Sequence, residues 1–172
     1  MPKFFLTFAA SLLILFTLEL LKPVQQYLIQ PFTGGLASLS TTIIEPFDAN
    51  VISHGRVIRD SASGFAVSIE AGCNGVEATI VLIAAVLAFP ATWRHKLIAI
   101  VAGFLAIQAL NIARIISLFY LGQWNFSIFE WTHLYLWPVL IMLDVLMVFA
   151  IYLRWLTIPN ATQRHPEQVE NG

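Results

Sequence analysis

Four long apolar stretches, each almost free of charge, constrain this chain more than any other feature. They cover residues 4–21, 76–93, 97–121 and 134–156. Each approaches the ~20 consecutive apolar residues that a helix needs to cross a bilayer. The chain is 58% hydrophobic and 11% charged, whereas an ordinary globular domain is roughly 25% charged. The pattern therefore predicts an all-α polytopic membrane protein with about four transmembrane helices.

Charge and cysteine content exclude several other classes of protein. The net charge is −1 and no basic run is present, so we expect no nucleic-acid partner. The single cysteine, Cys73, cannot form an internal disulfide. One cysteine and scattered histidines have no metal-ligand spacing, and no phosphate loop or dinucleotide fingerprint is present. We therefore expect no metal and no cofactor.

The apolar stretches organise the chain into one membrane domain, residues 1–156, that contains a large outer loop at 22–75. The first stretch, 4–21, follows a single lysine and precedes no small-residue cleavage site. We interpret it as a retained anchor, with a cleaved signal peptide as the alternative. Residues 157–172 are polar and contain two prolines, which predicts a loose C-terminal tail.

The outer loop has internal order. Residues 24–44 lack charge but contain Gln, Pro, Gly, Ser and Thr, a composition that favours a helix lying in the membrane interface. A re-entrant segment or a fifth spanning helix is the alternative. Residues 51–58 are rich in β-branched side chains, 59–64 are turn-like, and 65–70 alternate apolar and polar residues. This pattern predicts a small β-hairpin on the outer membrane surface.

Basic residues in the short loops predict the orientation. Arg94 and Lys96 lie together in the turn between the second and third stretches. With four spans, Lys3, Arg154 and Arg164 fall on the same side, whereas Lys22, Arg56 and Arg59 are spread over the long loop. The density of basic residues favours both termini in the cytoplasm.

Three reactive side chains are predicted to lie at one depth. Lys96 marks the cytoplasmic end of the third helix, and Arg114 lies about 27 Å further along it at 1.5 Å per residue. Counting back from the cytoplasmic ends of the second and fourth helices places Cys73 and His133 at the outer ends. All three therefore reach the outer face, although the sequence does not show that they touch.

The surroundings of Cys73 favour a nucleophile over a small buried hydrophobe, which is the ordinary alternative. Gly72 and Gly75 flank it, as where the backbone approaches another group closely. Asn74 is expected to cap the second helix, with Glu77 in a capping-box-like position. A thiolate at a helix N-terminus is favoured by the helix dipole.

Arg114 is the strongest single signal, because a charge within a span costs about 2.5 kcal/mol or more and usually faces the bundle interior. Asn111, one turn earlier, is expected to orient the guanidinium. His133 is a candidate base. The alternatives are that Arg114 extends to the interface and that His133 belongs to an aromatic belt with Trp131.

The run Glu70-Ala71-Gly72-Cys73-Asn74-Gly75-Val76-Glu77, the later Asn111-Ile112-Ala113-Arg114-Ile115 and the following His133 resemble the exosortase/archaeosortase family. The resemblance covers about residues 51–149, and the short chain is similar to the compact exosortase H type. It implies a multi-pass cysteine transpeptidase of the plasma (inner) membrane in which Cys73, Arg114 and His133 are catalytic.

The resemblance also implies a partner. Substrates would be exported proteins with a C-terminal sorting signal similar to PEP-CTERM: a short motif, a transmembrane helix and a basic end. Cleavage would occur at the outer, periplasmic side of the membrane through a thioester. Two alternatives stay open: a non-enzymatic membrane subunit or transporter component, and an intramembrane protease that releases its substrate to water.

Overall fold

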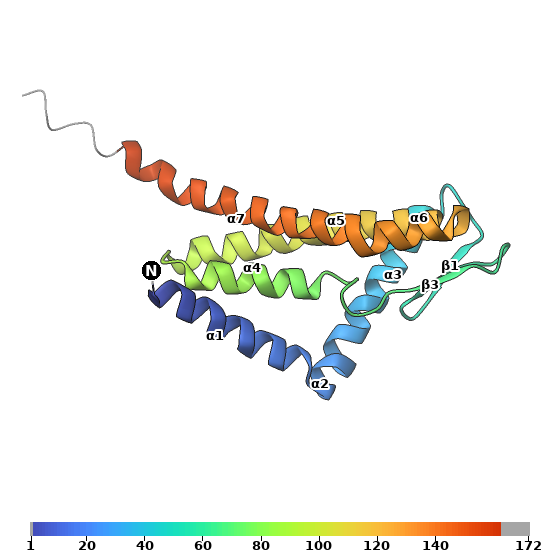
Figure 1. The fold of residues 1–172 in the computed structure, drawn as a ribbon, viewed down its shortest axis with the longest axis horizontal. Helices are drawn as coiled ribbons and strands as arrows, with labels where there is room; N and C mark the ends of the chain where they lie inside the picture. Colours follow the sequence, from blue (N-terminus) through green and yellow to red (C-terminus); the bar gives the residue numbers. More distant parts are fainter. Residues whose placement is uncertain (1, 163–172) are drawn as a thin grey trace, which may run out of the picture.

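A computed structural model describes residues 2–162 as a long helical bundle with a small sheet at one end (Figure 1). The elements in chain order are α1 (Pro2–Glu19), α2 (Lys22–Val24), the π-helix η1 (Gln25–Ile29), α3 (Gln30–Ile44), β1 (Val51–His54), β2 (Val57–Asp60), β3 (Ala66–Ser68), α4 (Val76–Ala88), α5 (Trp93–Trp124), α6 (Phe126–Trp131), the π-helix η2 (Thr132–Leu136) and α7 (Trp137–Thr162).

Two helical segments of the described chain are long and apolar enough to cross a membrane: α5 and the continuous run Phe126–Thr157. The pair Lys3–Glu19 and Lys22–Ile44 makes a third if the two arms, bent by 68°, are counted as one span. The four predicted transmembrane helices are therefore not confirmed. The predicted span 76–93 is shorter than expected: α4 has 13 residues, because Phe89 precedes Pro90 and leaves the helical conformation.

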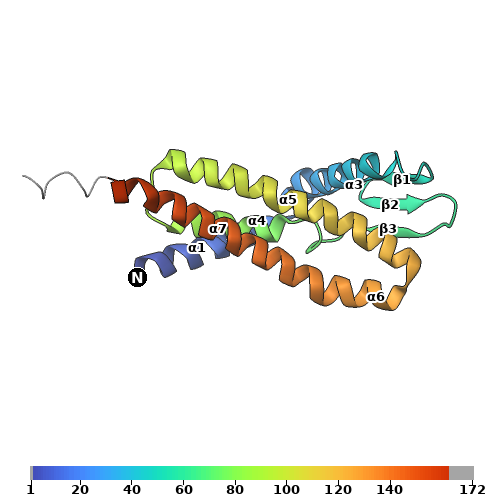
Figure 2. The same ribbon diagram turned by 90° about the horizontal axis from the view of Figure 1, so that it is seen from above.

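Helix α4 lies at the centre of the bundle, against α1, α5 and α7 (Figure 2). Its apolar residues form one core cluster with α5 and α7, in which Leu82 and Ile107 are fully buried. Gly103 of α5 allows this close approach, since a Cβ there would lie 2.3 Å from Leu82 and 2.9 Å from Val148. Outward-facing side chains on α1, α5 and α7 remain apolar and exposed, as expected of surfaces that face lipid.

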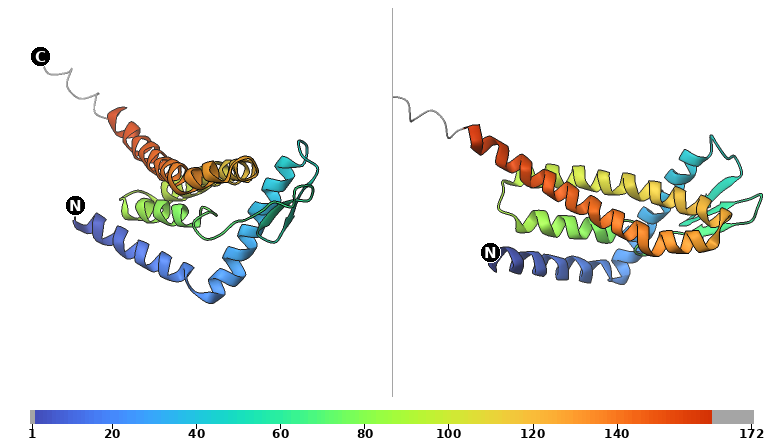
Figure 3. Two further views of the ribbon diagram at one scale, coloured as in Figure 1. Left: turned by 45° about the vertical axis from the view of Figure 1, so that its right-hand side comes forward. Right: turned by 45° about the horizontal axis from the view of Figure 1, so that its top comes forward.

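Residues 22–44 form a continuous helical arm that turns away from α1 (Figure 3). The prediction of a helix here is correct. Leu36, Ala37 and Ile44 of this arm are buried in a second core cluster with the sheet and the C-terminal half of α5. The arm therefore packs against the buried face of the sheet, a contact that its sequence did not predict.

The predicted β-hairpin is a three-stranded antiparallel sheet with the order β1-β2-β3. The expected first strand, 51–58, folds back on itself because Gly55 adopts a left-handed backbone conformation (φ +55°) between His54 and Val57, which pair. One face of the sheet, including Val51 and Ile58, packs into the second core cluster. The other face is exposed.

The C-terminal part of the chain also differs from the prediction. Residues 157–162 continue α7 as helix instead of beginning a loose tail. The rest of the predicted tail, 163–172, and with it Arg164, lies outside the described residues.

The basic residues that the orientation argument groups together lie at one end of the bundle. The first turn of α5 carries Arg94 and Lys96, and the His95 ring between them lies 4.6 Å from that of Trp155 near the end of α7. The sheet lies at the opposite end. The predicted grouping of these charges is thus consistent with the fold, and the side of the membrane to which each end belongs stays a prediction.

Candidate active site

Cys73 lies in the short loop that connects β3 of the sheet to α4 of the bundle. Two glycines shape this loop, since Gly72 (φ +81°) and Gly75 (φ +74°) adopt left-handed conformations that other residues rarely accept. The Cys73 N–H donates to the Glu70 carbonyl at 3.0 Å and closes the turn. The sequence thus folds locally so that the thiol is carried on a tight, two-glycine turn.

Contacts from three helices hold the loop in place. Asn74, 1% exposed, accepts a hydrogen bond from the Val76 N–H and donates one to Thr33 of α3. Glu77 of α4 accepts from the Gly72 N–H. Gly75 faces α5, where a Cβ would lie 2.8 Å from the Gln108 amide nitrogen.

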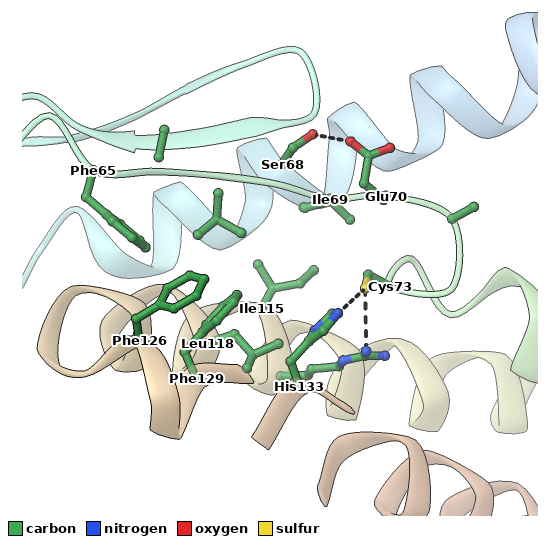
Figure 4. A pocket seen from close by; sticks show the side chains of 14 residues that line it. Phe65, Ser68, Ile69, Glu70, Cys73, Ile115, Leu118, Phe126, Phe129 and His133 are labelled. Atoms are coloured by element: carbon green, nitrogen blue, oxygen red, sulfur yellow. Dashed lines mark hydrogen bonds between the residues drawn. The ribbon is translucent and has the colours of Figure 1, made fainter. Parts of the chain in front are cut away.

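Arg114, 5% exposed, reaches from α5 to the Cys73 loop. Its Nη1 donates to the Gly72 carbonyl at 3.0 Å, and its Nη2 lies 3.4 Å from Cys73 Sγ. The guanidinium is therefore fixed by the backbone next to the thiol and directs positive charge at the sulfur (Figure 4). Its Nε is buried and has no hydrogen-bond partner among the described residues.

His133 completes the constellation from η2. Its Nε2 lies 4.0 Å from Cys73 Sγ, and its ring stacks on Phe129 with an interplanar angle of 3°. Its Nδ1 is buried without a hydrogen-bond partner in the described residues. This separation is at the upper limit for a hydrogen bond to sulfur, and such contacts often tighten only when a substrate binds.

Burial and charge act in opposite directions on Cys73. Burial raises the pKa of the thiol above its ordinary value, and the carboxylates of Glu77 and Glu70 raise it further, whereas the Arg114 guanidinium opposes them and lowers it. The net direction of the Cys73 pKa is upward, which favours the thiol form. These surroundings favour the thiol, whereas the helix N-terminus was expected to favour the thiolate.

A groove of about 370 Å³ leads to these three residues. One wall is the chain from Phe65 to Ala71, which includes β3, and the opposite side consists of side chains from α5, α6 and η2 (Figure 4). Leu118, Phe126 and Phe129 make that side apolar. Arg114 separates this groove from a second apolar hollow of about 190 Å³ between α4 and α7.

The structure brings Cys73, Arg114 and His133 together. Of the three predicted supporting residues, two contact the Cys73 loop and one does not contact Arg114 as expected. Asn74 and Glu77 hold the Cys73 loop, although the N-cap of α4 is Gly75, not Asn74. Asn111 does not orient the guanidinium as predicted: its amide, fully buried, has no hydrogen-bond partner among the described residues. The Gly72 carbonyl does so instead.

Residues of two kinds near Cys73 were not predicted from the sequence. From helices far away in the sequence, Thr33 bonds to Asn74 and Gln108 lies close against Gly75. Phe126 and Phe129 line the groove. Their only sequence signal is that they lie within a turn or two of His133, which is too weak to single them out. Within the described residues no group of three or more His, Cys, Asp and Glu side chains could hold a metal ion.

Comparison with known proteins gives one match. A family model described as transmembrane exosortase matches residues 2–151, which is most of the chain. No curated protein and no solved structure matches this chain.

Proposed function

Because the chain belongs to the transmembrane exosortase family, we propose that it is a cysteine transpeptidase that cleaves C-terminal sorting signals of exported proteins. The observation that carries this proposal is the contact of Arg114 Nη2 with Cys73 Sγ at 3.4 Å, with His133 Nε2 at 4.0 Å on the same sulfur. A nucleophile, a base and a cationic hydrogen-bond donor thus meet at the end of a groove.

The first half of the reaction forms a thioester. His133 Nε2 accepts the proton of the Cys73 thiol, and the sulfur attacks the scissile peptide carbonyl. Negative charge develops on the carbonyl oxygen, beside the Arg114 guanidinium, which stabilises it in a site of low dielectric. The C–N bond then breaks, and the protonated His133 returns the proton to the departing amine.

The second half frees the enzyme. An amine or water, deprotonated by His133, attacks the thioester carbonyl, and the C–S bond breaks to regenerate the thiol. An amine acceptor gives transfer and water gives hydrolysis.

The two hollows support a path for such a substrate. The groove in front of Cys73 suits the motif, and the hollow beyond Arg114 lies between two apolar helices, α4 and α7. Ala78 and Val81 on one side and Ile141 on the other line this hollow. An apolar helix that follows the motif in the sorting signal is of the chemistry that these walls accept.

A co-expression experiment tests the proposal. The substrate is an exported reporter domain fused to a C-terminal segment, taken from the same genome, that contains a short motif, an apolar helix and a basic end. We expect the wild-type protein to convert this reporter to a shorter form that lacks the helix, as measured by gel and mass spectrometry. A reporter without the short motif is the control. No conversion of any such segment would contradict the proposed function.

The proposed orientation has its own prediction. In a Cys73→Ala background, a cysteine at Ala62, in the exposed β2–β3 turn, is expected to react with a membrane-impermeant thiol reagent added from outside. A cysteine at Thr92, in the exposed α4–α5 turn, is expected to react only after the membrane is opened. Labelling is measured in spheroplasts by mass shift, and the reverse pattern would overturn the orientation.

A further inference from the structure

The sheet next to the candidate active site has a free edge. Its strand order is β1-β2-β3, so β3 pairs with β2 on one side and with no strand of the described chain on the other. β3 leads through a short loop to Cys73. An unpaired strand edge carries a row of backbone donors and acceptors that can bind another extended chain.

The pattern of hydrogen bonds between β2 and β3 shows which backbone N–H and C=O groups of β3 are free. Asp60 N–H donates to the Phe65 carbonyl at 2.9 Å, and Ile69 N–H donates to the Arg56 carbonyl at 3.0 Å. Positions in an antiparallel pair alternate between hydrogen-bonded and non-hydrogen-bonded. Residues 65, 67 and 69 therefore direct their backbone groups at β2, and the residues between them direct theirs away from it.

These outward positions are Ala66 and Ser68, which pair with Arg59 and Val57 in the non-hydrogen-bonded register. The N–H and C=O groups of both residues face the free edge. No other described residue supplies them with a hydrogen-bond partner. The backbone groups of Ala66 and Ser68 are thus available to pair with one short extended segment.

The groove that ends at Cys73 runs along this edge. The chain from Phe65 to Ala71 is one of its walls, and Leu118, Phe126 and Phe129 face that wall (Figure 4). About 370 Å³ is open between them. An extended peptide in this space would form backbone hydrogen bonds with β3 on one side and pack small or apolar side chains against the aromatic rings on the other.

The membrane determines the direction of the peptide. A sorting signal enters the site from its exported domain and continues into the bilayer as a helix, so its chain runs from the sheet toward the bundle. β3 runs the same way, from Ala66 through Ser68 to Cys73 and into α4. We propose that the segment immediately upstream of the scissile bond binds as a fourth strand, parallel to β3, on its free edge.

This proposal rests on the proposed function, and a proline substitution tests it. Ser68→Pro removes an edge N–H that β2 does not use, so the sheet is retained. The matched control is Ser53→Pro on β1, at the opposite edge. There the Ser61 N–H bonded to the Asn50 carbonyl indicates that Ser53 also directs its N–H away from β2.

We expect Ser53→Pro to process the sorting-signal reporter at the wild-type rate and Ser68→Pro to process it at least about tenfold more slowly. Cys73 should remain equally reactive toward a small alkylating reagent in both variants, which shows that the loop is intact. Processing by Ser68→Pro at the wild-type rate would overturn strand addition while leaving the proposed function standing. Absence of processing by the wild type would instead contradict the proposed function.

Disulfide trapping decides the direction without turnover. In a Cys73→Ala background, single cysteines replace Ala66 or Ser68, and single cysteines are scanned along the reporter upstream of the cleavage site. Neighbouring strands lie roughly 4.8 Å apart, within the Cα separation that a disulfide bridges. If residue 66 traps one reporter position, residue 68 should trap the position two residues closer to the helix. The reverse order, or trapping without this two-residue step, would overturn the proposal.

Discussion

Cys73→Ala will abolish processing of the sorting-signal reporter while the protein still inserts and accumulates. The chain has no second cysteine, so no other thiol can compensate. The side chain is half-buried, packs at the edge of the second core cluster and lies beside Arg114 and His133. Because alanine keeps the Cβ, the replacement removes only the packing of one sulfur atom. The measurement is the fraction of reporter that is shortened, by gel and by mass spectrometry.

Cys73→Ser is the matched variant. It preserves the shape of the side chain, and we expect it to leave little activity, because an alcohol needs stronger activation than a thiol near neutral pH. If release of the acyl group is the slower step, wild-type protein will carry a hydroxylamine-sensitive adduct of the upstream part of the reporter, and neither variant will carry a thioester. Full cleavage by Cys73→Ala would refute covalent catalysis and make the non-enzymatic membrane subunit the better interpretation.

Arg114→Lys will lower the rate of processing by about 10²–10³, the usual effect of removing one donor that stabilises an oxyanion. The guanidinium uses two nitrogens at once: Nη1 on the Gly72 carbonyl and Nη2 toward Cys73. A lysine ammonium is a single point charge on a flexible stem and cannot maintain both contacts in one plane. The initial rate of reporter cleavage at equal protein levels measures the loss.

Arg94→Lys is the control for this change, since Arg94 is exposed in the first turn of α5, at the other end of the bundle. It should process the reporter at the wild-type rate. A normal rate in Arg114→Lys would mean that charge alone matters at this position. A normal rate in Arg114→Ala would exclude Arg114 from the site.

Much of the architecture could be predicted from the sequence. The apolar stretches 97–121 and 134–156 lie within α5 and the run 126–157, because hydropathy over about 20 residues is a local property that the bilayer reads directly. The common depth of Cys73, Arg114 and His133 was also predictable. A helix rises by a constant amount per residue, so position along the membrane normal can be counted from the sequence.

Residue type and spacing did not determine which side chains from different segments are in contact. The rise per residue gives depth but not the rotation of each helix about its axis, which depends on packing against distant segments. Asn111 was expected to orient Arg114, yet the Gly72 carbonyl does so from another element. Likewise, nothing local to Cys73 indicates that Thr33 of α3 bonds to its neighbour Asn74.

The sequence by itself determined that this is a membrane protein with a cysteine, an arginine and a histidine at one depth. The tertiary structure decided that the three meet at Cys73 Sγ. It also decided that 51–58 forms two strands instead of one and that β3 exposes an unpaired edge along the groove. The physical reason is that hydropathy and helical rise are properties of a single segment. Side-chain contacts and strand pairing arise between segments, and only their mutual packing selects among the arrangements that each segment allows.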